Sequence, residues 1–203
     1  MKKIVLFLLP LFFILGSCNR KQMLLTRASH TVLEGVDDHS YVYIEYEEDG
    51  KTPHLNETNR IAGTNYLFAV ERELNLLDVA KMVKKVKDHK YEEDNMHRDE
   101  KGVFYIYVDS LHKNRAWFPF KELDFDFTGP TALENVVYVQ GANDFIFEGN
   151  KVDREQLLQS IVQRDSIQLG FNKDLSFETY LQIRVLLEEK EISNQFRKQD
   201  LVY

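Results

Sequence analysis

The only cysteine of the chain, Cys18, directly follows an apolar N-terminal segment. A disulfide bond within the chain needs a second thiol, so this means of stabilisation is excluded. The folded part has to be held together by hydrophobic packing, for which the 14 phenylalanines and 10 tyrosines are suitable material. The sequence therefore predicts one or two domains with aromatic-rich cores and no covalent cross-links.

The first 18 residues have the order of a secretory signal. Met1–Lys3 is basic, Ile4–Leu15 is apolar apart from Pro10, and small residues then lead to the cysteine. The closing residues Leu15-Gly16-Ser17-Cys18 resemble the lipobox of bacterial lipoproteins, in which the cysteine is acylated and becomes the first residue. Two alternatives remain open. One is an ordinary signal peptide, and the other is an uncleaved transmembrane helix, although about a dozen apolar residues fall short of the roughly 20 that span a bilayer.

The lipoprotein resemblance implies where the protein lies. Residues 1–17 would be removed as a signal peptide, and Cys18 would be the lipidation site, carrying acyl chains such as palmitate. The chain would then be anchored to a membrane of the bacterial cell envelope, with the outer membrane favoured, and face the periplasm. Its formal net charge of −7 becomes more negative when Lys2 and Lys3 are removed. An acidic chain of this kind is not expected to bind nucleic acid.

Composition divides the remaining chain into three segments. Residues 18–37 are polar and partly basic, which predicts a tether. Residues 38–130 and 131–203 each mix strand-like and helix-like patterns, which predicts two α+β units. The fold class that we expect is therefore α+β, with mixed sheets and packed helices.

In the first unit, aromatic and β-branched runs predict strands, and one amphipathic segment predicts a helix. The expected strands are 41–47, 65–70, 103–108 and 123–127, and the helix spans 75–88 with Asn75 as its N-cap. Residues 51–63 and 89–101 are expected to be loops, because they are rich in turn-forming or charged residues. Residues 116–120 contain Pro119, which suits an edge strand or a docking corner.

The second unit has a clearer pattern. The expected strands are 135–140, 144–148 and 166–171. Asp153 and Ser176 each precede an amphipathic segment and are expected to cap helices, the second of which spans 177–191. In that last helix we expect an inward face made of Tyr180, Leu181, Ile183, Val185, Leu186 and Leu187. The pattern of residues 195–203 gives no assignment.

The same unit resembles a known family. Three segments resemble the periplasmic domain of the ExbD/TolR family. Residues 144–152 are similar to its hairpin, and residues 155–158 are similar to its first helix. Residues 167–177 are similar to its third strand and to the start of its last helix. The resemblance to this biopolymer-transport family covers roughly residues 135–192 and implies an α+β fold that binds protein partners. Two features depart from the family. Asn172 stands where aspartate is common, and the N-terminal apolar segment has no acid to match the family's proton-carrying aspartate. The resemblance therefore does not imply proton-driven transport by this chain.

The first half of the chain has features in common with the second. Residues 41–47, the helix near 77–86 and residues 103–108 give the order strand, helix, strand, and Asp109 then follows as an acid at the equivalent step. A duplicated unit would account for this likeness. The order strand, helix, strand is also common among mixed folds in general, so both explanations stay open.

No group of residues has the spacing of a known catalytic or metal site. The six histidines are at positions 30, 39, 54, 89, 97 and 112, and none has the i, i+4 partner of a helical zinc site. Asp124 and Asp126 share a strand face, as in calcium or glycosidase sites, but a solvated face explains them more simply. The lysines at 81, 84, 85 and 87 fit a basic docking strip or, as we favour, a solvated helix face. We expect no cofactor and no metal.

The function that we expect is a non-enzymatic protein-interaction module of the bacterial envelope. Its partner would be another envelope protein or a second copy of the chain, bound for example by addition to a strand edge. The alternative is a ligand-binding lipoprotein that uses Trp117, Phe118 and Phe120 as a platform for a glycan or peptide. A concave pocket lined by these three aromatics would favour the alternative. An exposed strand edge or apolar face would favour the interaction module.

Overall fold

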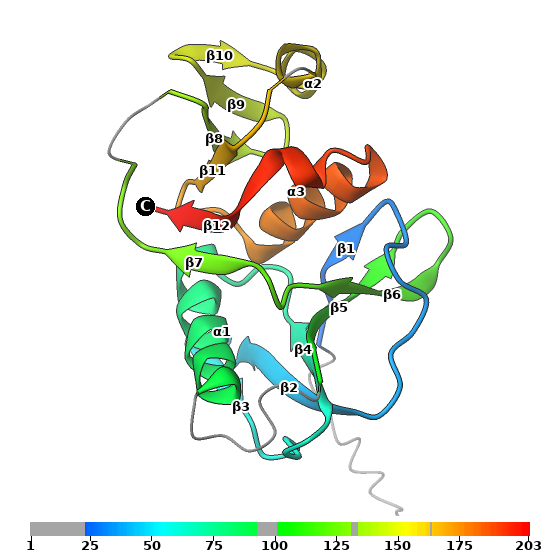
Figure 1. Ribbon diagram of the computed structural model, residues 1–203. Helices are drawn as coiled ribbons and strands as arrows, with labels where there is room; N and C mark the ends of the chain where they lie inside the picture. The colour runs from blue at the N-terminus through cyan, green and yellow to red at the C-terminus, as the bar shows by residue number, and fades with distance from the viewer. Residues whose placement is uncertain (1–22, 93–100, 131–133, 163) are drawn as a thin grey trace, which may run out of the picture.

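Two mixed β-sheets of six strands each and three α-helices form the part of the chain that the computed structural model describes (Figure 1), residues 23–92, 101–130, 134–162 and 164–203. This architecture confirms the predicted α+β class. The predicted signal peptide, the predicted lipidation site Cys18 and residues 93–100 of the expected charged loop lie outside the described ranges. Within those ranges no helix is both long and apolar enough to cross a lipid bilayer.

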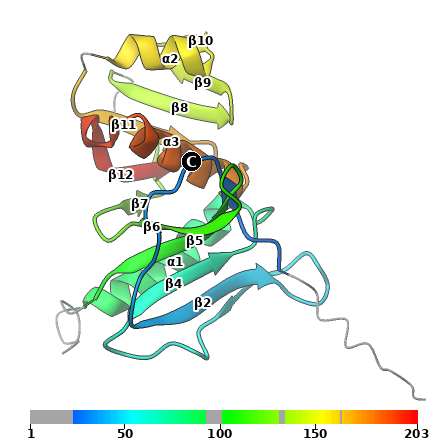
Figure 2. The same ribbon diagram turned by 90° about the vertical axis from the view of Figure 1, so that its right-hand side faces the viewer.

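The first sheet has the order β1-β5-β4-β2-β3, and β6 also pairs with β5. Its strands are β1 (Arg27–Ala28), β2 (His39–Tyr46), β3 (Pro53–Asn56), β4 (Asn65–Val70), β5 (Val103–Asp109) and β6 (Asn114–Pro119). β2, β4 and β5 run parallel, whereas β3 and β6 are antiparallel to their neighbours. α1 (Leu76–Tyr91) connects β4 to β5 and lies behind the sheet in Figure 2, so its buried apolar stripe faces the sheet.

The second sheet has the order β10-β9-β8-β11-β12-β7. Its strands are β7 (Asp124–Asp126), β8 (Val136–Gly141), β9 (Asp144–Phe147), β10 (Asn150–Val152), β11 (Ile167–Phe171) and β12 (Phe196–Val202). β8, β11, β12 and β7 run parallel, and β9 and β10 form antiparallel hairpins. The helices are α2 (Arg154–Ile161) and α3 (Phe177–Glu189), and a short 3₁₀ helix (Ser193–Gln195) precedes β12.

Each helix begins at the capping residue that the sequence predicts. The Asn75 side chain accepts hydrogen bonds from the backbone N–H groups of Leu77 and Asp78. Asp153 forms a full capping box with Gln156, and the Ser176 hydroxyl accepts the N–H of Thr179. These side chains satisfy N–H groups of the first turn that have no partner within the helix. The predicted N-caps are confirmed.

The two halves of the chain share a strand arrangement. β3-β2-β4-β5 in the first sheet and β9-β8-β11-β12 in the second have the same order and the same relative directions. In each, a helix joins the third strand to the fourth, α1 in one case and α3 in the other. The topology therefore repeats, although the strand that enters the first helix is β4 and not the 41–47 strand compared in the sequence.

The repeated units meet where their helices begin. The N–H of Leu76 donates to the carbonyl of Leu175 at 2.8 Å, and the N–H of Phe177 donates to the carbonyl of Leu74 at 2.8 Å. A reciprocal pair of this kind is what an approximate two-fold axis between the helix starts would produce. Each half thus supplies a hydrogen-bond acceptor that the helix of the other half needs at its first turn.

One continuous hydrophobic core spans both halves. α3 lies between the sheets and is buried on most of its surface, with Phe177, Tyr180 and Leu181 each 0 % exposed. The Tyr105 ring of β5 packs edge-to-face on Phe177, with ring centroids 5.0 Å apart. The expected inward face of the last helix is confirmed except for Leu186, which is half-buried, and Arg184 is buried although it was not expected to be.

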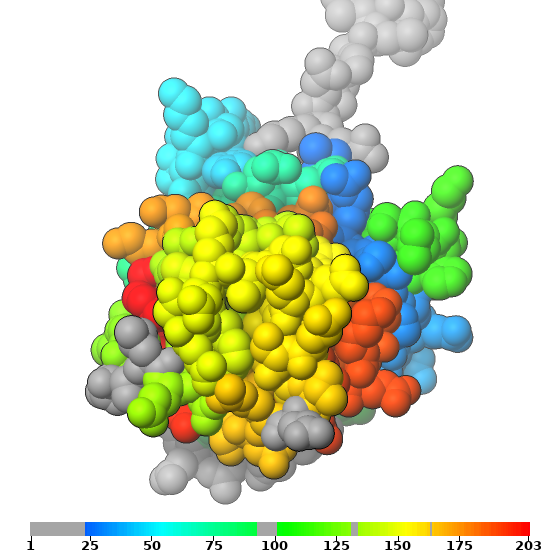
Figure 3. Space-filling model, turned by 90° about the horizontal axis from the view of Figure 1, so that it is seen from above, coloured from blue at the N-terminus to red at the C-terminus, as the bar shows by residue number. Residues whose placement is uncertain are grey.

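Part of the expected tether packs against the fold. Ala28 of β1 pairs with Asp109, and the backbone N–H of Arg27 donates to the Glu178 side chain of α3 at 3.0 Å. Leu33 bridges to Trp117 at the free edge of β6. Figure 3 shows the N-terminal residues in blue beside α3 in orange-red. The expected tether over residues 18–37 is corrected over residues 25–33, because backbone pairing and burial hold this segment to both halves.

Other expectations need correction. β3 falls within the expected loop 51–63, and β10 falls where only a turn was expected. α1 continues to Tyr91, beyond the expected end at residue 88. Residues 196–202, for which no assignment was predicted, form β12, which lies between β11 and the edge strand β7 of the second sheet. These segments are short, polar or interrupted by proline, and their pairing partners decide their structure.

Candidate functional site

One face of the second sheet carries no helix. α2 and α3 both lie in front of this sheet in Figure 2. Alternate residues of its strands, such as Val137 and Leu169, point toward the helices and are at most 1 % exposed. The residues between them point to the opposite face. That helix-free face is therefore the part of the sheet on which a partner can reach side chains of several strands together.

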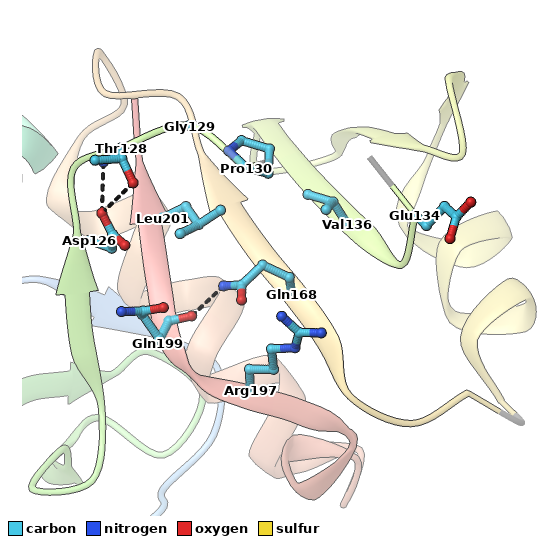
Figure 4. A pocket seen from close by; sticks show the side chains of 10 residues that line it. All are labelled: Asp126, Thr128, Gly129, Pro130, Glu134, Val136, Gln168, Arg197, Gln199 and Leu201. Carbon is cyan, nitrogen blue, oxygen red and sulfur yellow. Dashed lines mark hydrogen bonds between the residues drawn. The ribbon is translucent and has the colours of Figure 1, made fainter. Parts of the chain in front are cut away.

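A pocket of about 300 Å³ lies on the helix-free face, across β8, β11, β12 and β7 (Figure 4). Its lining is mainly polar and charged, with a small apolar floor. The lining includes Asp126, Glu134, Val136, Gln168, Arg197, Gln199 and Leu201. This volume is at the lower end of the range for ligand pockets, so the pocket suits one side chain or a short segment of a partner.

A bulge in β12 builds the pocket. Ile167 pairs with Phe196, but Leu169, two positions later, pairs with Asp200, so β12 has extra residues between these pairs. The Gln168 side-chain Nε2 donates to the carbonyl oxygen of Gln199 and to that of Leu169, in place of the interrupted ladder. Bulges redirect side chains and are frequent beside functional sites. Here the bulge exposes Arg197 and Gln199 at the pocket.

Two charged side chains of the pocket, Asp126 and Arg197, are held in place by local hydrogen bonds. Oδ1 of Asp126 accepts the backbone N–H of Thr128 at 2.8 Å and its hydroxyl at 2.7 Å. These two bonds, the hydroxyl bond above all, lower the pKa of the Asp126 carboxyl, which is ionised at neutral pH. The Nε of Arg197 donates to the carbonyl of Ser166 at 3.1 Å. With Glu134 the lining has two carboxylates and one guanidinium, so it favours a cation.

Two tyrosines extend the face beside the pocket. The rings of Tyr138 on β8 and Tyr203 lie 5.0 Å apart between centroids and meet above Gly170 of β11. A Cβ at Gly170 would lie 3.1 Å from a ring carbon of Tyr203, closer than nearly all such contacts. Glycine at this position therefore lets the two rings close over the strand.

A buried ion pair lies on the other side of β12. Arg184 of α3 is 3 % exposed and Asp200 is 0 % exposed. The Arg184 Nε donates to Oδ2 of Asp200 at 3.0 Å, its Nη2 donates to Oδ1, and the Tyr180 hydroxyl donates to Oδ2 at 3.0 Å. Burial raises the pKa of the Asp200 carboxyl despite the neighbouring guanidinium. This pair could not be found in the sequence, because an arginine within an apolar helix stripe does not reveal its acidic partner.

The aromatic platform proposed as the alternative is not formed as expected. Phe118 and Phe120 are each 2 % exposed and belong to the core, where Phe120 stacks on Tyr105 with centroids 3.9 Å apart. Trp117 is half-buried, and its backbone N–H donates to the carbonyl of Leu33. These three side chains therefore do not line one concave surface. The reason is strand geometry, because neighbours along β6 point to opposite faces of the sheet.

Two of the lysines and both aspartates singled out in the sequence have structural partners. The Lys84 ammonium lies 2.9 Å from Oδ1 of Asp124, and the Lys87 ammonium donates to the carbonyl of Leu123, so the lysine-rich face of α1 holds β7. Asp124 and Asp126 have separate partners and do not form one site. Within the described ranges no three histidine, cysteine, aspartate or glutamate side chains are placed to share a metal ion.

Asp109 organises the turn between β5 and β6. One carboxylate oxygen accepts the backbone N–H groups of Leu111 and His112, and the other lies 2.6 Å from the Thr31 hydroxyl and 2.8 Å from Nδ1 of His112. Burial alone would raise the pKa of Asp109, but these hydrogen bonds outweigh burial and hold the pKa well below its ordinary value. The carboxylate also ties the N-terminal segment to the hairpin.

We expect Asp109→Asn to lower the free energy of unfolding by about 1–3 kcal/mol near pH 7. The pKa of Asp109 is lower in the folded state than in the unfolded state, where it is about 3.9. The contribution of Asp109 to the free energy of unfolding is therefore complete above about pH 3.9, and it is lost as the pH falls toward the pKa of the folded state. Urea unfolding of both proteins at about pH 7 and pH 3 measures this, with exposed Asp37→Asn as control. If the free energies of unfolding of the wild type and Asp109→Asn differed by the same amount at both pH values, the hydrogen-bonded carboxylate would not stabilise the fold as described.

Comparison with known proteins gives no match: no protein-family model fits the chain, and no curated protein or solved structure is significantly similar to it. The strand and helix order implied by the ExbD/TolR resemblance is present over β8 to α3. Membership of that family nevertheless remains a prediction from sequence layout. The same holds for the lipobox, whose residues lie outside the described ranges.

Proposed function

We propose that this chain is a lipid-anchored, non-enzymatic binding module of the bacterial envelope that faces the periplasm. It recognises an extended, basic segment of another envelope protein at the pocket on the helix-free face of the second sheet. The observation that carries this proposal is the pocket itself, in which a β-bulge exposes Arg197 and Gln199 beside the carboxylates of Asp126 and Glu134. A function of this kind needs a shaped surface and no titrating acid–base pair.

Charge complementarity supports a basic partner. The pocket has Asp126 and Glu134 against Arg197, and the chain as a whole has a formal net charge of −7. A lysine or arginine of the partner would lie between the two carboxylates, with its aliphatic part over Val136 and Leu201. The acidic field of the rest of the molecule would increase the rate of encounter with such a segment.

The packed N-terminal segment limits how far the module can lie from its anchor. Backbone contacts with the fold begin at Leu24, whose carbonyl accepts the N–H of Arg72 at 3.0 Å. About five residues then separate Cys18 from Leu24, and a fully extended chain over this stretch spans at most about 22 Å. With a lipid at Cys18 the pocket would stay close to the membrane, where an envelope protein presents its own juxtamembrane segments.

The pocket is tested by removing its negative charge. Asp126→Asn combined with Glu134→Gln keeps the side-chain volumes, and we expect it to weaken partner association about tenfold, as for two partly exposed charge pairs. The measurement is photo-crosslinking in native membranes from a photoreactive residue at position 199. The matched control is Glu34→Gln with Glu155→Gln, two exposed carboxylates outside the pocket. If the pocket variant and the control variant gave the same crosslinked partner at the same yield, recognition by this pocket would be ruled out.

The anchor is tested separately. We expect Cys18→Ala to accumulate as an unprocessed and unacylated precursor, because the thiol is the proposed acylation site. Metabolic labelling with a fatty-acid analogue, followed by gel mobility, measures both properties. Label that persists in the variant would contradict the lipoprotein assignment. The pocket variants above should be labelled as wild type, which separates anchoring from recognition.

An enzymatic function would give a different result. Substitution of one carboxylate or histidine would then abolish the cellular function and leave both folding and partner crosslinking unchanged. Self-association is the other outcome, and it would be seen as crosslinks from position 199 to a second copy of this chain.

A further inference from the structure

Residues 24–33 form a strap that lies across both halves of the fold. In Figure 2 this segment, in blue, runs from β1 beside α3 past β6 toward the start of β2. On the first half the strap pairs with β5 and bridges to β6. On the second half the backbone of Arg27 is hydrogen-bonded to the side chains of Glu178 and Gln182, at 3.0 and 3.1 Å. In the chain the strap lies between Cys18, the proposed anchor, and the rest of the fold.

Backbone hydrogen bonds hold the strap to β5. The carbonyl of Thr26 accepts the N–H of Val108 at 2.9 Å, and the carbonyl of Ala28 accepts the N–H of Ser110 at 2.8 Å. The pairing of β4 with β5 ends at Ile106, and beyond this point the strap takes the place of β4 beside β5. The N–H groups of Val108 and Ser110 therefore take their acceptors from the strap.

The strap buries little apolar surface. Within residues 24–33 the buried side chains are those of Thr26 and Ala28, whereas Leu24 and Leu33 are 48 % and 37 % exposed. Hydrophobic stabilisation is roughly proportional to the apolar area removed from water, so side chains this small contribute little to holding the strap. Segments with few buried apolar contacts open locally at a free-energy cost well below that of global unfolding.

One side chain of the strap weakens its attachment. Thr26 is 0 % exposed, and its buried hydroxyl oxygen has no hydrogen-bond partner in the part of the chain that the structure describes. A hydroxyl of this kind has lost its hydrogen bonds to water and gained none in exchange. Detachment of the strap returns the hydroxyl to water, so its burial favours the detached state.

We propose that the strap detaches while both sheets stay folded, and that it thereby sets the reach of the module; the effect on reach rests on the proposed lipid anchor at Cys18. With the strap docked, the chain from Cys18 to Leu24 spans at most about 22 Å. With the strap detached, the chain is next hydrogen-bonded to the fold at Asp37, whose carbonyl accepts the side-chain amide of Asn65 at 2.7 Å. The chain from Cys18 to Asp37 spans at most about 68 Å, so detachment extends the reach about threefold.

Hydrogen exchange of the full chain, purified in detergent and read by fragmentation mass spectrometry, tests detachment. The reference amide is that of Phe68, which lies in the middle of β4 between β2 and β5. We expect the amides of Val108 and Ser110 to exchange at least about a hundredfold faster than this reference. Equally slow exchange at all three amides would show that the strap opens only when the whole protein unfolds, and would overturn the proposal.

Variants that lack a single hydroxyl test the cause of detachment. Thr26→Val removes the unpartnered hydroxyl, and we expect exchange at the two strap-bonded amides to become about tenfold slower. Thr31→Val removes the hydroxyl that donates to Asp109 at 2.6 Å, and we expect exchange at the same amides to become about tenfold faster. The matched control is Ser29→Ala, which removes an exposed hydroxyl and should exchange as wild type. An unchanged rate in Thr26→Val would overturn the role of the buried hydroxyl.

The effect on reach is tested with the acylated chain on vesicles of phosphatidylethanolamine and phosphatidylglycerol that carry a surface acceptor dye. A donor dye at Lys81→Cys, an exposed position on α1, reports how far the fold lies from the membrane. Ala28→Asp places a carboxylate at a buried position and should detach the strap. We therefore expect less energy transfer than in Ser29→Asp, which makes the same change at the exposed neighbour. Equal transfer in the two variants would overturn the effect on reach.

Two further results separate the strap from the rest of the fold and from the anchor. The amide of Phe68 should stay protected in Ala28→Asp, and loss of this protection would overturn detachment as a local event. A chain that shows the expected exchange but does not attach to vesicles would contradict the lipid anchor, and detachment of the strap would still be supported.

Discussion

Replacing Arg184 by methionine should lower the free energy of unfolding by about 3–5 kcal/mol. The substitution leaves the Asp200 carboxylate, 0 % exposed, with only the Tyr180 hydroxyl as partner. An unpaired buried charge is far more costly than the pair is favourable, because desolvation is no longer offset by attraction. Chemical denaturation at neutral pH measures the effect.

A double variant separates the lost charge pair from lost packing. In Arg184→Met with Asp200→Leu no charge is buried, so we expect most of the stability to return. The control is Arg197→Met, which replaces an exposed arginine on β12, the strand that carries Asp200. Its free energy of unfolding should change by less than about 1 kcal/mol. If Arg184→Met alone unfolds at the same denaturant concentration as wild type, the ion pair is not buried as described.

Leu181→Asp should destabilise the fold by several kcal/mol. Leu181 is 0 % exposed on α3, the helix that lies between the two sheets, and Arg184, the buried cation three residues further on, is already paired with Asp200. Because one core spans both halves, we expect the loss to be seen in a single thermal transition.

The matched comparison is Val162→Asp, which makes the same kind of change at a residue that is 66 % exposed. It should shift the melting temperature very little. Melting of Leu181→Asp at the wild-type temperature would show that α3 does not pack between the sheets.

The sequence allowed prediction of those features that depend on local chemistry. Asn75, Asp153 and Ser176 were recognisable as helix caps because an oxygen-bearing side chain precedes an amphipathic run in each case. β5 was predictable because few charges interrupt its apolar residues, and both of its faces are covered. In these segments the local pattern and the tertiary environment favour the same structure.

β12 and the pocket could not be predicted, because they depend on contacts between distant residues. The exposed run Arg197-Lys198-Gln199 has no strand pattern, and its place in the sheet depends on the bulge opposite Ile167–Leu169 and on the pairing of Gln199 with Asp124 of β7. Arg184 and Asp200 are 16 residues apart. Nothing in the sequence around either residue indicates that the two side chains will pair. Phe118 was expected on a surface, since a single sequence does not show which strand face will be covered.

The reciprocal hydrogen bonds at the two helix starts bear on how the chain reaches its fold. The N–H of Phe177 needs the carbonyl of Leu74, and the N–H of Leu76 needs the carbonyl of Leu175, about 100 residues away along the chain. Closing a loop of that length is entropically costly, and the cost is recovered only when the core between the halves forms. Neither repeat therefore satisfies the first N–H of its helix with its own residues, and this contact couples the assembly of the two units.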